Sequence, residues 1–397
     1  MNKSTKSNPD LEKRVLECIN DEETTRLLCD LIGIPSENPP GGETAVAAKL
    51  FEVFQSVGLD SRLDEIEPGR ANLEVACGAS TGPTLLFNGH TDTVPAGPSW
   101  SREPHRATIE AGRVYGRGAC DMKGGLAAIT QAMIGVMRAK IPLQGRVLFD
   151  AVIDEESGGL GTRRTVERGR QAEWAIIAEP TELQVLRASN GEIVTEVTFS
   201  GLAAHGSTPE AGRNAIYDAT AFVALLEKQT GLWASNRHPL TGPPTYNVGT
   251  IKGGVEPWIV PAESVVTVDR RIVPGQTQEQ AATDLDSVLR QLEADRPGLR
   301  YSKRVLVSFP SIVVPEESPV CQVLHGAASE IRGSDVDFGG LRATSDAAVL
   351  IQAGIPTIVF GPGSITESAH RADEFVPLQE VHQAARAFAL TIVRLLT

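Results

Sequence analysis

The pattern of hydrophobic and polar positions differs between two parts of the chain. In residues 1–188 and 309–397, short apolar runs typical of buried strands alternate with segments whose apolar residues recur at helical spacing. The strands are expected at 84–88, 146–153, 174–178 and 355–360, and the helices at 44–57 and 123–137. Strands that alternate with helices predict an α/β fold, with a mostly parallel sheet flanked by helices on both faces.

The second pattern covers residues 189 to 308, where hydrophobic and polar residues alternate along the expected strands, as they do in half-exposed antiparallel strands. Its expected strands are 192–199, 246–251, 264–272 and 300–307, and its expected helices are 214–229 and 278–294. The order β-α-β-β-α-β is that of a split βαβ, ferredoxin-like domain. The sequence therefore predicts one domain made of residues 1–188 and 309–397, with residues 189–308 inserted as a second, α+β domain.

Composition narrows the function classes. A chain of 397 residues is long enough for two domains. Its net charge of −13 leaves no basic stripe for nucleic acid and no polybasic patch for a membrane surface. We expect no secretory signal and no membrane span. The five cysteines form no CxxC pair, which favours reduced thiols in a cytoplasmic protein.

Candidate chemistry is concentrated in five short patches of acidic residues and histidines. They are His90-Thr91-Asp92, Asp121, Asp154-Glu155-Glu156, Glu179 and His370. We expect each patch to follow a strand-like hydrophobic run, so that all converge at the edge of the sheet where α/β proteins bind ligands. Imidazoles and carboxylates together are the donors of a two-metal hydrolytic site. Alone, the acidic run at 154–156 would instead be a solvated turn, and Cys120 is a buried neighbour rather than a ligand.

Six motifs, in order along the chain, resemble one enzyme family. They are HTDTVP (90–95), YGRGACDMKGG (115–125), DEESGGLGT (154–162), EP (179–180), GLAAHGSTPEAGRNAI (201–216) and AH (369–370). The resemblance is to the acetylornithine deacetylase, succinyl-diaminopimelate desuccinylase and carboxypeptidase G family of dinuclear metallo-aminoacylases and peptidases. It covers essentially the whole chain. It implies that the first domain is the metal-binding catalytic domain and the inserted domain a lid and dimerisation domain.

The resemblance also implies a ligand set for two divalent metal ions. Asp121 would bridge them, His90 and Glu179 would complete one site, and Glu156 and His370 the other. Zn²⁺ is the expected metal, with Co²⁺ or Mn²⁺ as alternatives because nitrogen and oxygen donors accept several divalent ions.

Two more acidic residues have implied roles beside the ligands. Asp92 would hold the His90 imidazole through its other nitrogen. Glu155 would be the general base that takes a proton from a metal-bridging water, since neighbouring side chains of an extended segment point in opposite directions.

Residues of the inserted domain are implied to act on the substrate. His205 would cross from the partner subunit of a homodimer to bind the developing oxyanion, although a lone histidine here would be read as a surface residue. Arg271 would bind the substrate carboxylate, and Arg270 is expected to face solvent by strand alternation. Asn247 is either a substrate contact or a structural turn residue.

Two departures from the family pattern fall beside the expected pocket. Trp258 replaces a polar residue, and Arg342 replaces the first glycine of a Gly-Gly-Thr-Ser-Asp stretch. Both either contact a flat or anionic substrate or pack against the lid. The identity of the substrate therefore stays open.

The sequence predicts a metal-dependent enzyme that hydrolyses the C–N bond of an N-acyl amino acid or a related carboxylated small molecule. A catabolic aminohydrolase or a dipeptidase/carboxypeptidase with the same metal centre is the alternative. A non-catalytic binding protein is disfavoured, because Glu155 and all five expected ligands are present.

Overall fold

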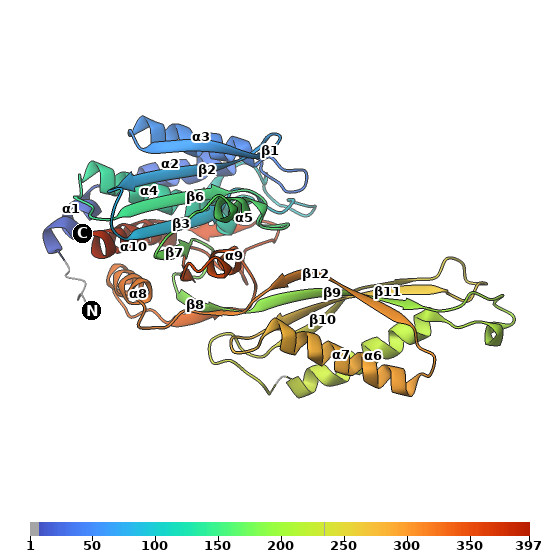
Figure 1. The fold of residues 1–397 in the computed structure, drawn as a ribbon. Coiled ribbons are helices and arrows are strands. Elements are labelled where there is room, and N and C mark those ends of the chain that lie inside the picture. The colour runs from blue at the N-terminus through green and yellow to red at the C-terminus, as the bar shows by residue number, and fades with distance from the viewer. Residues whose placement is uncertain (1–7, 234) are drawn as a thin grey trace. The chain divides into compact units, whose positions relative to one another are not determined.

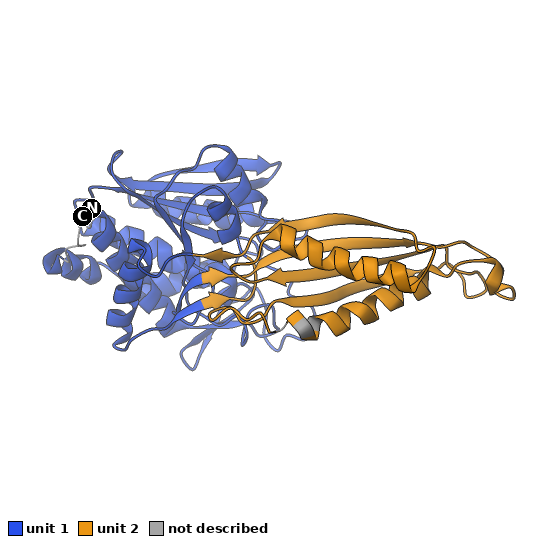
Figure 2. Ribbon diagram, turned by 60° about the horizontal axis from the view of Figure 1, so that its bottom comes forward, with its two compact units in different colours: residues 1–187, 314–339, 345–397 blue, residues 188–313, 340–344 orange. Residues whose placement is uncertain are grey.

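The computed structural model describes residues 8–233 and 235–397. The chain forms two compact units, coloured separately in Figure 2. Unit 1 is Met1–Arg187, Val314–Gly339 and Ser345–Thr397, and unit 2 is Ala188–Val313 and Gly340–Thr344. Unit 2 thus contains Ala188, residues 309–313 and the short segment 340–344 in addition to the span 189–308 that was predicted for the inserted domain.

A nine-stranded sheet forms the centre of unit 1 (Figure 1), and its short edge strand at residues 312–313 is counted with unit 2. Along the sheet the strands are β1 (Asp60–Glu67), β2 (Arg70–Gly78), β6 (Arg146–Val152), β3 (Thr84–His90), β7 (Trp174–Ile177), β15 (Thr357–Val359), β8 (Val185–Ser189) and β13 (Ile312–Val313), with β14 (Phe338–Leu341) paired to β8. The four central strands, β6, β3, β7 and β15, are mutually parallel, while β1, β2, β8 and β13 pair antiparallel with their neighbours. The predicted buried strands are these four, and the predicted fold class is confirmed.

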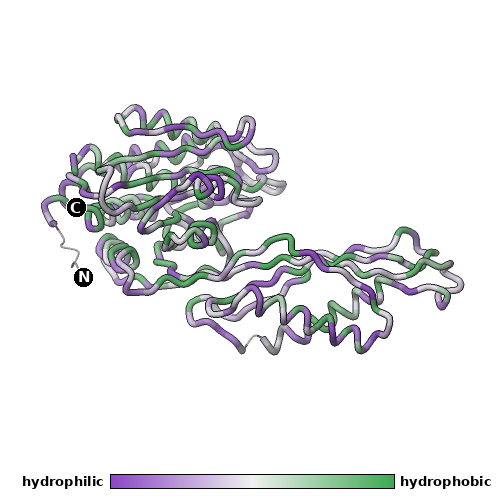
Figure 3. Tube along the Cα trace, in the orientation of Figure 1, coloured by the Kyte–Doolittle hydropathy of each residue, from purple (hydrophilic) through white to green (hydrophobic). Residues whose placement is uncertain are grey.

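Helices cover both faces of this sheet. They are α1 (Pro9–Glu17), α2 (Asp21–Ile32), α3 (Glu43–Ser56), α4 (Gly124–Arg138), α5 (Leu160–Glu167), α8 (Pro319–Arg332), α9 (Ala347–Gln352) and α10 (Leu378–Leu396). Phe87 of β3 packs edge-on against Phe388 of α10. The next residue, Asn88, faces the other side and donates a hydrogen bond to Thr162 of α5. Buried apolar side chains of α4 and α10 belong to the core of unit 1. Figure 3 shows hydrophobic stretches along the helices and strands that alternate with hydrophilic ones.

Unit 2 has the predicted β-α-β-β-α-β order. Its elements are β9 (Gly191–Ser200), α6 (Ala215–Trp233), β10 (Thr245–Gly253), β11 (Glu263–Ile272), α7 (Gln278–Asp295) and β12 (Tyr301–Phe309). The strands pair antiparallel in the order β10-β11-β9-β12, and α6 and α7 pack against the sheet. Alternate residues of β11, such as Val266 and Val268, face these helices and form the core of the unit.

A small sheet of β4 (Thr108–Glu110), β5 (Arg113–Tyr115) and β16 (Phe375–Pro377) adjoins the irregular segment Ala119–Lys123, which leads into α4 of unit 1. Among the residues that the structure describes, no helix combines the length and apolarity needed to cross a membrane.

Candidate metal centre

Three of the five predicted patches lie at the carboxyl ends of adjacent parallel strands. His90 is the last residue of β3, the acidic run 154–156 follows β6, and Glu179 follows β7. β3 pairs with both β6 and β7, so these strand ends meet at one edge of the sheet. The hydrophobic runs that build the core therefore also deliver the polar side chains to a common place.

The other two patches do not follow strands, so the prediction that every patch closes a strand-like run is wrong for them. Asp121 lies in the short segment Ala119–Lys123, where its own backbone is extended (φ −121°, ψ 96°), and His370 lies in the irregular segment between β15 and β16. Neither segment has the continuous apolar pattern of a buried strand. Hydrogen bonds to the distant Glu374 fix the path of the first segment, and hydrogen bonds between Ser368 and Phe375 fix that of the second.

The two carboxylate oxygens of Asp121 face two different imidazoles. Its Oδ1 lies 2.9 Å from Nε2 of His90, and its Oδ2 lies 3.2 Å from Nε2 of His370. On the His90 side, Oε1 of Glu179 is 3.5 Å from the same Nε2. On the His370 side, Oε2 of Glu156 is 3.1 Å from the imidazole. The five predicted ligands therefore form one cluster with Asp121 at its centre.

Buried polar atoms in this cluster fit divalent cations. Nδ1 of His90 lies 2.9 Å from the main-chain carbonyl of Asp92, so Nδ1 carries a proton and Nε2 faces the carboxylates, where it holds a second proton or offers a lone pair to a metal ion. Oε1 of Glu179 is buried and has no hydrogen-bond partner. A lone pair and carboxylate oxygens that converge without donors between them are mutually repulsive unless a cation or a proton joins them. The donor set of nitrogen and oxygen suits Zn²⁺ and similar ions.

The electrostatics of the cluster reflect the same crowding of negative charge. Burial opposes charge on His90, but Glu179 and Asp121 raise its pKa well above the usual range. Hydrogen bonds to Asp121 and Glu156 raise the pKa of His370 to about 10. Burial, together with Asp121, raises the pKa of Glu179 well above that of an ordinary glutamate. Each raised pKa means that the surrounding negative charge stabilises a bound proton, and the same charge would stabilise a metal cation at this edge of the sheet.

Asp92 contacts more than the imidazole. Its carboxylate accepts the backbone N–H groups of Glu155 and Glu156, at 3.2 and 3.1 Å, while its Oδ1 lies 3.6 Å from Nδ1 of His90. The closer partner of that nitrogen is the Asp92 main-chain carbonyl. Asp92 thus joins the end of β3 to the acidic turn that follows β6.

Glu155 also belongs to the cluster, beside His90 and Glu179. One of its carboxylate oxygens can share a cation with His90 and Glu179, because the three donor atoms lie within 4.8 Å of one another. Burial raises the pKa of Glu155 well above its usual range, and the carboxylates of Asp346 and Glu156 add to the effect. A carboxylate with a raised proton affinity beside a metal site has the chemistry of a general base.

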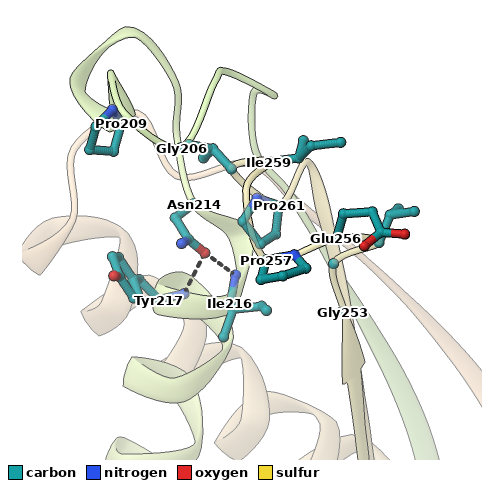
Figure 4. A pocket seen from close by; sticks show the side chains of 13 residues that line it. Gly206, Pro209, Asn214, Ile216, Tyr217, Gly253, Glu256, Pro257, Ile259 and Pro261 are labelled. Carbon is teal, nitrogen blue, oxygen red and sulfur yellow. Dashed lines mark hydrogen bonds between the residues drawn. The ribbon is translucent and has the colours of Figure 1, made fainter.

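His205 and Trp258 lie in adjoining segments of unit 2. His205 forms an isolated bridge with Ile259, and the N–H of Gly206 donates to the Trp258 carbonyl at 2.7 Å. Both side chains are exposed, Trp258 to 61%. Beside them lies a groove of about 540 Å³, in which Asn214 caps α6 through the N–H groups of Ile216 and Tyr217 (Figure 4).

Arg271 lies on β11 with its guanidinium already engaged within unit 2. It donates to Glu192 at 2.7 Å, to Asp269 at 3.1 Å and to the hydroxyl of Thr344 at 3.2 Å. Arg342 is exposed in the same unit. Asn247 is also exposed, on β10 opposite Asp269.

The prediction that Arg270 faces solvent is wrong. Arg270 is 3% exposed, its guanidinium lies 4.3 Å from the centre of the Tyr246 ring, and Asp284 of α7 is 3.6 Å away. Strand alternation holds, but the residues of β11 that face the helices are the even-numbered ones. Tertiary packing decides which face of a strand is buried. Because both Arg270 and Arg271 are arginines, the alternating pattern alone does not show which of the two faces the helices.

Two residues that hold the centre together had no role in the sequence analysis. Asn38 donates to the carboxylates of Asp92 and Asp154, at 3.1 and 3.0 Å. Glu374 is buried and accepts backbone N–H groups of the segment that carries Asp121. The neighbouring Pro-Pro-Gly-Gly turn at 39–42 signals only a turn, and the position of Glu374 four residues after His370 was the only available hint.

This fold and site define a class of protein, a hydrolase with a candidate metal centre at the carboxyl edge of an α/β sheet. The sequence profile of peptidase family M20/M25/M40 matches residues 86–394. Acetylornithine deacetylase of Myxococcus xanthus is 31% identical over 339 residues, which are 83% of this chain and 85% of the relative. N-formyl-4-amino-5-aminomethyl-2-methylpyrimidine deformylase of Halalkalibacterium halodurans is 27% identical over 92% of each chain.

Solved structures share the fold. Aminopeptidase PepT from Bacillus cereus superposes with a TM-score of 0.78 at 22% identity, over 95% of this chain and 99% of that one. A dinuclear metal-binding peptidase from Bacillus subtilis superposes with a TM-score of 0.71 at 14% identity, over 98% and 99%. The chain belongs to peptidase family M20/M25/M40. It is a metal-dependent hydrolase that acts on amide bonds, as the sequence predicted.

Proposed function

We propose that this enzyme uses two divalent metal ions to remove a short acyl group from the nitrogen of a carboxylated small molecule. The observation that carries the proposal is the position of Asp121, whose two oxygens face His90 and His370 from opposite sides of one carboxylate. The acyl group is inferred from the curated relatives, whose names specify removal of acetyl and formyl groups.

The proposed ligand roles follow from the side of Asp121 on which each donor lies. His90 and Glu179 would hold one ion, Glu156 and His370 the other, and Asp121 both. When bound, the ions would polarise the scissile carbonyl and lower the pKa of a water molecule. Zn²⁺ is the proposed metal, and Co²⁺ or Mn²⁺ would fit the same donors.

Glu155 is the proposed general base. Its burial and the surrounding carboxylates favour the protonated state, so the carboxylate would accept a proton readily and could pass it to the departing amine nitrogen. Asp92 would fix the orientation of Glu155 toward the substrate, because the Asp92 carboxylate accepts the backbone N–H groups of Glu155 and Glu156.

Unit 2 is the proposed lid and dimerisation domain. We propose a homodimer in which His205 of one subunit donates a hydrogen bond to the oxyanion formed in the active site of the other. The exposure of His205 on a loop of unit 2 supports a role outside its own unit. Arg271 would bind the substrate carboxylate, and Asn247, Trp258 and Arg342 are proposed to line the pocket.

Arg271 supports a specific expectation about the substrate. Its guanidinium pairs with Glu192 and Asp269, so a substrate carboxylate must compete with these side chains or bind beside them. A substrate that carries both a carboxylate and a cationic group could pair its carboxylate with Arg271 and its cationic group with Glu192 or Asp269. N-acyl derivatives of basic amino acids are therefore the preferred candidates. We also propose a cytoplasmic location, supported by five cysteines that all occur as free thiols.

A substrate screen tests the proposed reaction. Release of a primary amine would be measured for N-acetyl and N-formyl amino acids and for dipeptides, after reconstitution with Zn²⁺, Co²⁺ or Mn²⁺. We expect turnover of N-acyl amino acids with at least one metal, and turnover at least ~100-fold slower with the Glu155→Ala variant. Turnover of dipeptides alone would favour the peptidase alternative.

A further inference from the structure

Glu374 is a buried carboxylate that binds the segment carrying Asp121. Its Oε1 accepts the backbone N–H groups of Cys120 and Asp121, at 2.8 and 3.0 Å. Its Oε2 accepts the N–H of Gly118 at 3.0 Å and a guanidinium N–H of Arg117 at 2.6 Å. The side chain is 1% exposed, so these four donors replace water completely.

The backbone of Glu374 also binds the segment that carries Asp121. Its carbonyl accepts the N–H of Gly116 at 2.9 Å, and the next residue, Phe375, begins β16 opposite Tyr115 of β5. Glu374 therefore binds both ends of the segment 116–121. Its main-chain carbonyl binds Gly116 at one end, and its carboxylate binds Cys120 and Asp121 at the other. Gly118 allows this path with φ = 82°, in the left-handed region that favours glycine.

The segment that carries Glu374 also carries His370. A compact loop joins them, closed by the Ser368 hydroxyl, which donates to the carbonyl of Phe375 at 2.6 Å and accepts its N–H at 2.7 Å. Asp121 and His370 are far apart in the sequence, yet the carboxylate of one meets the imidazole of the other at 3.2 Å. The carboxylate of Glu374 connects their two main chains, and the Cys120 thiol adds a weaker link to the Ser364 carbonyl at 3.6 Å.

We propose that Glu374 is a positioning residue that sets the distance between Asp121 and His370 and thereby the affinity of one metal ion. The proposal rests on the ligand roles proposed above. The ion between Asp121, Glu156 and His370 would have two of its three protein ligands on segments that Glu374 ties together. The other ion, with His90 and Glu179 at strand ends, would have only one.

A carboxylate is required because four donors converge on it. Glutamine would present an NH₂ group in place of one oxygen, and that group cannot accept the N–H groups that now meet that oxygen. Arg117 balances the negative charge that the donors alone would leave partly uncompensated. The predicted consequence of Glu374→Gln is a displaced Asp121 main chain rather than a missing ligand.

The test is metal binding to the full-length, metal-free protein, measured by titration with Zn²⁺. Glu374→Gln is compared with Glu12→Gln, a matched change in a buried glutamate that pairs with Arg394 between α1 and α10. We expect two ions per wild-type chain. In Glu374→Gln the affinity for one of them should fall ~10–100-fold, the usual effect of losing a group that orients a ligand. In Glu12→Gln both affinities should be retained.

A second variant keeps the test decisive if Glu374→Gln does not fold. Ser368→Ala removes the hydroxyl that closes the loop between His370 and Glu374, and it should weaken the same ion in the same direction. Two ions bound with wild-type affinity in Glu374→Gln, or in Ser368→Ala where only that variant folds, would overturn the proposal. Fewer than two ions on the wild type would instead contradict the proposed two-metal function.

Discussion

Nε2 of His90 lies 2.9 Å from Oδ1 of Asp121, while the Nδ1–H of the same imidazole is held by the Asp92 carbonyl. This arrangement fixes the tautomer and aims a lone pair at a carboxylate. The contact is unfavourable for two electron-rich groups alone and favourable once a proton or a metal cation joins them. The arrangement therefore makes His90 and Asp121 the natural starting point of a metal centre.

Loss of Glu155 should remove turnover without removing metal. Because the proposed role is proton transfer and not coordination, Glu155→Ala should lower kcat by ~10²–10⁴-fold. The checks are steady-state kinetics and metal analysis of the same preparation. Wild-type kcat, or a loss of bound metal equal to the loss of activity, would show that Glu155 is not the base.

The proposed role of His205 can be tested by mixing subunits. His205→Ala and Glu155→Ala homodimers should each be nearly inactive, because each lacks one group in both active sites. A mixed dimer contains one site with an intact Glu155 and an intact His205, and should recover up to about half the activity per dimer. Mixed dimers isolated with two different affinity tags and found inactive would place His205 outside the partner's site.

Arg271 and Glu192 should have opposite effects on the binding of a carboxylated substrate. Arg271→Ala should raise KM ~10–100-fold, the cost of losing a charged hydrogen bond. Glu192→Gln frees part of the guanidinium, which now donates to Glu192 at 2.7 Å, and should lower KM for substrates with a carboxylate and no cationic group. Steady-state kinetics with one acyl group on neutral and basic amino acids makes the comparison. An unchanged KM in both variants would remove this cluster from the pocket.

Gly125 at the start of α4 should be essential for packing beside Glu179. A Cβ at this position would lie 2.2 Å from the Ala178 carbonyl oxygen, immediately before Glu179. Gly125→Ala should therefore lower the free energy of unfolding by about 1–3 kcal/mol. Chemical denaturation measures the change.

Gly326 offers the control in another helix. A Cβ at Gly326 of α8 meets only the Arg394 guanidinium, at 4.0 Å, so Gly326→Ala should raise the free energy of unfolding by about 0.5–1 kcal/mol. Equal effects of the two substitutions would contradict the packing argument.

The fold was largely predictable because its signals are local. Buried strands such as 84–90 and 146–152 are continuous apolar runs, and their ends place His90 and the acidic run after β6 without further information. The alternating strands and amphipathic helices of unit 2 likewise define its β-α-β-β-α-β order.

The parts that could not be predicted depend on tertiary contacts. The paths of the segments carrying Asp121 and His370 are set by Glu374 and Ser368, through hydrogen bonds that leave no periodic pattern. The buried position of Arg270 depends on which face of β11 meets α7. The family resemblance named Asp121 and His370 as ligands, but only the structure shows what brings them together.

The most direct test of the two-metal centre is anomalous diffraction at the zinc edge from crystals grown with Zn²⁺. The account predicts two peaks per chain, about 3.5–4 Å apart, with one carboxylate oxygen of Asp121 bound to each ion. The first ion should also bind His90 and Glu179, and the second Glu156 and His370. A single peak, or two peaks of which only one contacts Asp121, would contradict it.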